Sequence, residues 1–178
     1  MNIVDLSQPL YDHMPVYPGD PEVIIKRVST LEKDGWNMNV LTFPTHIGTH
    51  VNIPIHAVNG GKTLDDYSPD AFLGSSVVYS SPGSIQQNIG LLFENTTISK
   101  EIVDIIIKTK PKFIGVGGYF ESDRELEIEK VLLKNEIISF EGLVNIEKLP
   151  KNQTLTFYGV PLKIKDGDGS PVRAFATI

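Results

Sequence analysis

The sequence predicts a single mixed α/β domain, and three observations support this. Its 178 residues suit one domain with a sizeable core and are few for two. Short segments rich in β-branched and aromatic residues recur between turn residues, whereas only two substantial stretches have helical spacing. Gly and Pro punctuate these segments without forming a linker, and no internal repeat is present. We therefore expect one domain over residues 1–178, without regular βαβ alternation.

The expected strands are the short segments in which β-branched and aromatic residues lie between turn residues. They outnumber the expected helices, so strands should dominate the domain. In chain order they are 23–28, 38–43, 76–79, 113–116, 137–140, 154–158 and 172–176.

Two amphipathic helices are expected. The first begins with Ser99 as its N-cap, carries an apolar stripe at helical spacing and stops before Pro111. The second begins at Ser122, where SDRE has the spacing of a capping box, and ends near Asn135. A short helical turn is also expected at 69–73.

Composition excludes several classes of function. A formal net charge of −6, a pI near 5.2 and the lack of any basic cluster argue against nucleic acid as a partner. The apolar runs are far shorter than the roughly 20 residues of a membrane-spanning helix, and the N-terminal segment lacks a basic signal-peptide start. We therefore expect a cytoplasmic protein. With no cysteine, any metal must be bound by His, Asp, Glu, Asn or backbone oxygen.

The most informative stretch is HIGTHVNIPIH, residues 46–56, called the histidine segment below. It holds three of the four histidines of the chain: His46, His50 and His56. Gly48 and Pro54 interrupt it, so a long helix is disfavoured and a tight loop is expected. Loops often carry functional groups, so this segment is the first candidate for a site.

The residue types of the histidine segment suit metal binding. A neutral imidazole is a good ligand for zinc and other first-row divalent ions, and Gly48 would let the rings of His46 and His50 face one point. Asn52 could add a carbonyl oxygen. For a lone histidine such as His13, in a proline-rich loop, a structural role is the better interpretation. Three histidines in eleven residues favour a site.

The histidine segment closely resembles the HxGTHxDxPxH motif of the cyclase family, which includes kynurenine formamidases and isatin hydrolases. The resemblance extends to DLSQPLYDHMPVYPGDP near the N-terminus, IGVGGYF in the middle and VPLKIKDGDGSPVRA near the C-terminus. The resemblance implies a swivelling β/β/α fold that assembles into a homodimer or homotetramer. It also implies hydrolysis of amide bonds with one or two bound divalent ions, for which Zn and Mn are the first candidates.

The resemblance also implies roles for individual residues. His46 and His50 resemble metal ligands, and His56 resembles the catalytic acid or base. Tyr17, in PVYPGDP, stands where the family often has a ring that stacks on substrate. Ordinary loop packing is an equally good interpretation of Tyr17.

Two positions depart from the family pattern. Asn52 replaces an Asp that can bridge two metals, and an amide cannot bridge as a carboxylate does. Glu141 resembles a metal-binding Glu, but Glu129 stands where the family has its partner His. Helical projection places Glu129 on the apolar arc of its helix, where a carboxylate needs a partner such as a metal. An exposed glutamate is the alternative.

These departures compensate in charge, which suggests a metal site rewired toward oxygen ligands, with Mn, Mg or Ca favoured at its second half. The sequence thus predicts a kynurenine formamidase-like hydrolase of a small amide, formamide, cyclic amide or lactone. Metal-activated water would attack, with His56 as general acid and base. The alternatives are a non-catalytic small-molecule-binding homologue with a degenerate metal site, and a metal-stabilised structural subunit. The presence of His56 favours the enzyme.

Overall fold

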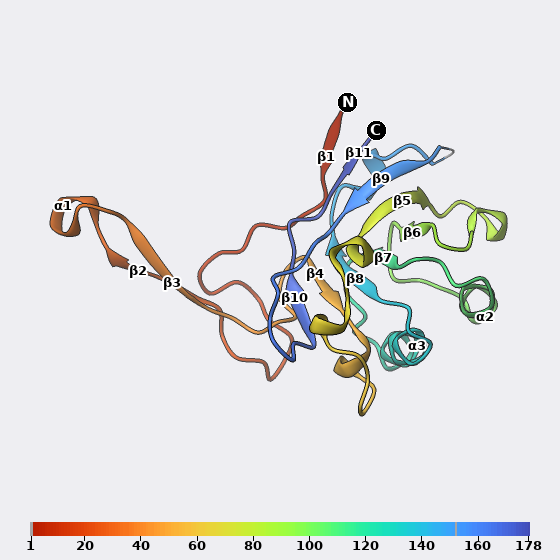
Figure 1. Ribbon diagram of the computed structural model, residues 1–178, viewed down its shortest axis with the longest axis horizontal. Coiled ribbons are helices and arrows are strands. Elements are labelled where there is room, and N and C mark those ends of the chain that lie inside the picture. The colour runs from red at the N-terminus through yellow and green to blue at the C-terminus, as the bar shows by residue number, and fades with distance from the viewer. Residues whose placement is uncertain (1, 152) are drawn as a thin grey trace.

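The computed structural model describes residues 2–151 and 153–178 (Figure 1). Nine strands form the main sheet, in the order β1-β11-β9-β5-β6-β7-β8-β4-β10. Their bounds are β1 (Ile3–Asp5), β4 (His50–Asn52), β5 (Leu73–Val78), β6 (Gly90–Phe93), β7 (Ile114–Gly117), β8 (Ser139–Leu143), β9 (Leu155–Tyr158), β10 (Gly169–Pro171) and β11 (Phe175–Thr177).

The centre of the sheet is parallel and its flanks are antiparallel. β5, β6, β7 and β8 pair in parallel, and the helices α2 (Lys100–Thr109) and α3 (Asp123–Lys134) make the crossovers from β6 to β7 and from β7 to β8. Apolar side chains fill two cores, one with the helices and one on the other face, where Phe113, Phe140 and Phe157 pack together. The predicted mixed α/β fold is confirmed.

The local helix signals were reliable. Ser99 caps α2 by accepting a hydrogen bond from the backbone N–H of Ile102, and Ser122 and Glu125 form the expected capping box of α3. Each predicted strand overlaps an observed one, and the turn expected at 69–73 is a 3-10 helix. The 3-10 helices are Pro54–His56, Leu64–Asp66, Pro69–Phe72, Pro82–Ser84 and Ile146–Lys148.

The expectation that the histidine segment is a loop is wrong over β4. Gly48, with a positive φ of 58°, turns the chain, and the next residues form a strand paired with β8 on one edge and β10 on the other. Because side chains alternate along a strand, His50 and Asn52 share one face while Val51 points into the core. The segment therefore places two of its three candidate ligands, His50 and Asn52, on the sheet.

A two-stranded hairpin projects from the molecule at the left of Figure 1. This arm comprises β2 (Ile24–Ser29), the short helix α1 (Leu31–Asp34) and β3 (Met38–Thr42). It exposes large apolar side chains, among them Trp36 at 66% and Val40 at 50%. In the described part of the chain, no helix has the length and apolar character needed to cross a membrane.

Candidate active site

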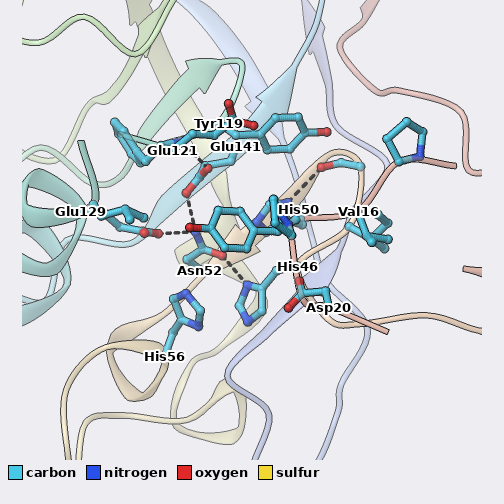
Figure 2. A pocket seen from close by; sticks show the side chains of 17 residues that line it. Val16, Asp20, His46, His50, Asn52, His56, Tyr119, Glu121, Glu129 and Glu141 are labelled. Atoms are coloured by element: carbon cyan, nitrogen blue, oxygen red, sulfur yellow. Dashed lines mark hydrogen bonds between the residues drawn. The ribbon is translucent and has the colours of Figure 1, made fainter. Parts of the chain in front are cut away.

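A pocket of about 390 Å³ lies over the face of β4 that carries His50 and Asn52 (Figure 2). The loop around Tyr17 lines its mouth, together with residues 119–121, which follow β7. Glu129 of α3 and Glu141 of β8 reach it from the other side. All the site residues expected from the sequence line this one pocket: Tyr17, His46, His50, Asn52, His56, Glu129 and Glu141.

His50 carries a buried, neutral imidazole ring. Its side chain is buried, and Nδ1 lies 2.9 Å from the carbonyl oxygen of Gly48, to which it donates. That hydrogen bond leaves Nε2 as the nitrogen with a lone pair. Burial, the largest cause, lowers the pKa of His50 to about 3, so the ring is uncharged at neutral pH.

His46 faces an oxygen at each ring nitrogen. Nδ1 lies 2.7 Å from Asn52 Oδ1, and Nε2 lies 2.8 Å from a carboxylate oxygen of Asp168. Burial lowers the pKa of His46, but the hydrogen bonds to Asp168 and Asn52 outweigh it and raise that pKa overall. Asn52 Oδ1 and the Asp168 carboxylate are both hydrogen-bond acceptors. Each ring nitrogen of His46 that faces them must therefore carry a proton or bind a metal ion.

The amide of Asn52 is oriented by two buried carboxylates (Figure 2). Its Nδ2 donates to Glu129 Oε1 and, at 2.7 Å, to Glu141 Oε1, so Oδ1 must point toward His46. The other oxygen of Glu141 accepts from the backbone N–H of Phe120 at 2.9 Å. Burial, and next the charge of Glu129, raise the pKa of Glu141 well above its ordinary value.

The predicted burial of Glu129 is therefore confirmed, with 5% of the residue exposed. Its partner is the neutral amide of Asn52, where the sequence analysis also considered a metal. At the position where the motif has Asp, Asn52 offers an amide N–H group that donates to both glutamates.

Asp168 is the site residue that sequence reasoning missed. It lies just before β10, accepts from Thr45 Oγ1 at 3.0 Å and, beyond His46, lies 3.7 Å from His56 Nδ1. The hydrogen bond from His46, and next the proximity of His56, lower the pKa of Asp168. The sequence feature that could have pointed to Asp168 is the stretch KIKDGDGSPV, which was already part of the family resemblance. It lacks the spacing of metal-binding residues. His46, His56 and Asp168 offer ligand atoms within 4.8 Å of one another.

His56 and Tyr17 occupy different parts of the pocket. His56 ends the 3-10 helix Pro54–His56, with its ring centroid 3.9 Å from that of His46. It is partly exposed, so it can meet both substrate and solvent. Tyr17 is half-exposed at the mouth, which is compatible with stacking on a ligand and with loop packing.

The donor set fits a divalent ion. His50 is neutral and buried, and the nitrogen of His46 and the amide oxygen of Asn52 already face each other as two ligands of one ion would. Nitrogen ligands with a nearby oxygen suit Zn or Mn. The carboxylates of Glu129 and Glu141 lie directly behind Asn52.

Known proteins resemble this chain in sequence and in fold. A family model described as "Putative cyclase" matches residues 4–91. A kynurenine formamidase of Geobacillus thermodenitrificans is 30% identical over 200 residues, covering 96% of this chain and 95% of the relative. The chain belongs to the cyclase family.

Other proteins match over more than 90% of their length. A kynurenine formamidase of Salinibacter ruber is 29% identical, over 98% of this chain and 96% of that protein. Isatin hydrolase A of Ralstonia solanacearum superposes with a TM-score of 0.78 at 20% identity, over 98% of this chain and 91% of that one. An isatin hydrolase bound to thioisatinate gives a TM-score of 0.81 at 17% identity, over 99% and 92%.

Proposed function

We propose that this protein is a metal-dependent hydrolase of a small-molecule amide, formamide, cyclic amide or lactone. The observation that carries the proposal is the facing pair His46 Nδ1 and Asn52 Oδ1, 2.7 Å apart, next to the neutral ring of His50. The kynurenine formamidase and isatin hydrolase relatives support the choice of amide substrates.

His46, His50 and Asn52 would hold one divalent ion, Zn or Mn. Such an ion would polarise the substrate carbonyl and make water at the site more acidic. Glu129 and Glu141 would orient Asn52 through its amide nitrogen, which makes them indirect contributors. Among the described residues that line the pocket, none is Lys or Arg, so a covalent lysine intermediate is not part of the proposal.

His56 would move the proton. Its ring would take a proton from the attacking water as the new C–O bond forms, and donate it to the departing nitrogen or oxygen as the bond to carbon breaks. The water then supplies the hydroxyl of the carboxylic acid product. Tyr17 at the mouth would cover an aromatic substrate and hold it against the pocket.

The rate of hydrolysis should depend on the bound metal ion. We expect purified protein to cleave aromatic formamides, cyclic amides or lactones, to lose at least about 100-fold in rate after chelation, and to regain it with Zn or Mn. Turnover can be followed by absorbance of the opened or deformylated product. Turnover that persists in metal-depleted protein would contradict the proposal.

One observation favours a second candidate, a small-molecule-binding protein without turnover. The amide nitrogen of Asn52 donates to both Glu129 and Glu141. Because it occupies these two carboxylates, less room is left between them for a second metal ion. Such a protein would bind the same aromatic amides, measurable by calorimetry, and release them unchanged.

We also propose that the chain forms a homodimer or homotetramer through its arm. Strand pairing places Met38 and Val40 on one face of the hairpin, with Lys26 beside Val40, and places Asn39 and Leu41 on the other face. A hairpin of two strands is only marginally stable alone, and exposed apolar faces of this kind mark contact surfaces. A second copy presenting the same face is the simplest occupant.

Val40→Lys should therefore release monomers, because a charge would be buried at the contact. Light scattering after size exclusion measures the mass, with Asn39→Ser, on the opposite face of the hairpin, as the matched control. We expect the wild type and the control to exceed one chain in mass. A wild-type monomer, or a Val40→Lys variant of unchanged mass, would overturn the arm contact.

A further inference from the structure

The carboxylate of Asp168 is fixed from several directions. Oδ2 lies 2.8 Å from His46 Nε2 and 3.7 Å from His56 Nδ1, while Oδ1 accepts from Thr45 Oγ1 at 3.0 Å. The backbone carbonyl of Asp168 also accepts from the N–H of Ile53 at 3.3 Å. This anchoring means that Asp168 can impose an orientation on the rings it contacts.

The contact decides which nitrogen of His46 serves the pocket. A carboxylate accepts only, so Nε2 of His46 must carry a proton to bond Asp168. In the neutral ring this leaves the lone pair on Nδ1, which faces Asn52 Oδ1. A carboxylate behind a ligating histidine fixes its tautomer and strengthens it as a donor.

The same atoms could suggest that Asp168 is itself a ligand, with His46 and His56. Two observations argue against this. The side chains that line the pocket include those of both histidines but not that of Asp168, which contacts His46 from outside that lining. Ligation through Nε2 of His46 would also leave out His50, which lines the same pocket and whose Nδ1 donates to the Gly48 carbonyl at 2.9 Å, so that its Nε2 carries the lone pair.

Gly169 gives independent steric support. A Cβ at this position would lie 2.6 Å from His46 Cε1 and 2.6 Å from the carbonyl oxygen of Val51. The imidazole thus rests directly on the backbone of β10, with the carboxylate of Asp168 at its edge. Only a glycine leaves room for the ring there, which indicates a cradle shaped around one orientation of His46.

We propose that Asp168 is a positioning residue that makes His46 bind the ion through Nδ1 and holds His56 beside it. The inference rests on the proposed function, because it assigns the outer contacts of that metal site. A single carboxylate oxygen would thereby fix both the ligand ring and the proton-transferring ring in one geometry.

Histidine nitrogen NMR of the Zn²⁺-loaded protein tests the proposal directly. We expect His46 to show a protonated Nε2 and a metal-bound Nδ1. With Asp168→Asn, we expect this signature to change and Zn²⁺ affinity to fall about 10- to 100-fold. Asp166→Asn is the matched control, since Asp166 carries the same charge two residues earlier and its side chain makes no recorded contact with either ring. The control should match the wild type.

Two results would overturn the positioning role. One is Zn²⁺ bound through Nε2 of His46, and the other is an Asp168→Asn variant with unchanged spectrum and affinity. Wild-type protein that binds no Zn²⁺ would instead refute the proposed function. The inference would then be judged on metal-free protein, where Asp168→Asn must shift the ring signals of His46 and His56 while Asp166→Asn must not.

Discussion

His56→Ala protein is expected to retain its metal and lose about 10²- to 10⁴-fold in kcat, the usual contribution of a general acid and base. The reason is that His56 lies beside His46 at the pocket but outside the ligand trio of His46, His50 and Asn52. Steady-state hydrolysis of the best amide substrate, with metal content measured on the same samples, separates the two effects.

The matched control is His13→Ala, because His13 lies on the surface next to Asp12 and Glu22. It should hydrolyse at the wild-type rate. A His56→Ala variant with wild-type kcat would remove the proposed proton transfer, and one that had also lost its metal would make His56 a ligand.

Asn52→Asp should destabilise the metal-free protein by about 3–5 kcal/mol, the cost of leaving a charge uncompensated in a buried site. The substitution removes the N–H groups that donate hydrogen bonds to Glu129 and Glu141, and it adds a third carboxylate beside them. Zn or Mn should recover much of this loss, because the new carboxylate could bridge ions. Urea unfolding with and without metal measures both changes.

Asn59→Asp, in an exposed turn, makes the same change of residue without the buried neighbours and should have little effect. If metal-free Asn52→Asp were as stable as the wild type, the two glutamates would not depend on the Asn52 amide. If added metal gave no recovery, the site would be degenerate, as the binding-protein alternative requires.

The parts of the fold that could be predicted are those encoded locally. Ser99 and Ser122 mark helix starts through hydrogen bonds within one turn, so both helices were located from sequence. β4 was missed because three residues form a strand only between β8 and β10, whose pairing residues lie far along the chain. The same is true of β1, β6 and β10.

The residues of the candidate site also divide into those that could be predicted from the sequence and those that could not. Glu129 was identified from the family resemblance, by its spacing from Glu141, and helical projection supported it by placing its carboxylate on an apolar arc; its burial is confirmed. Asp168 was missed because its contact with His46 spans 122 residues and leaves no periodic pattern in the sequence. The orientation of Asn52 was equally inaccessible, since it depends on two carboxylates from α3 and β8.

The most direct test of the central claim is the metal content per chain, measured by elemental analysis on untagged protein purified without chelator. We expect near-stoichiometric Zn or Mn in the wild type and its loss in His50→Ala, which removes a buried neutral ligand. Wild-type protein that contains no metal, and takes up none from an excess of divalent ions, would contradict the assignment as a metal-dependent hydrolase.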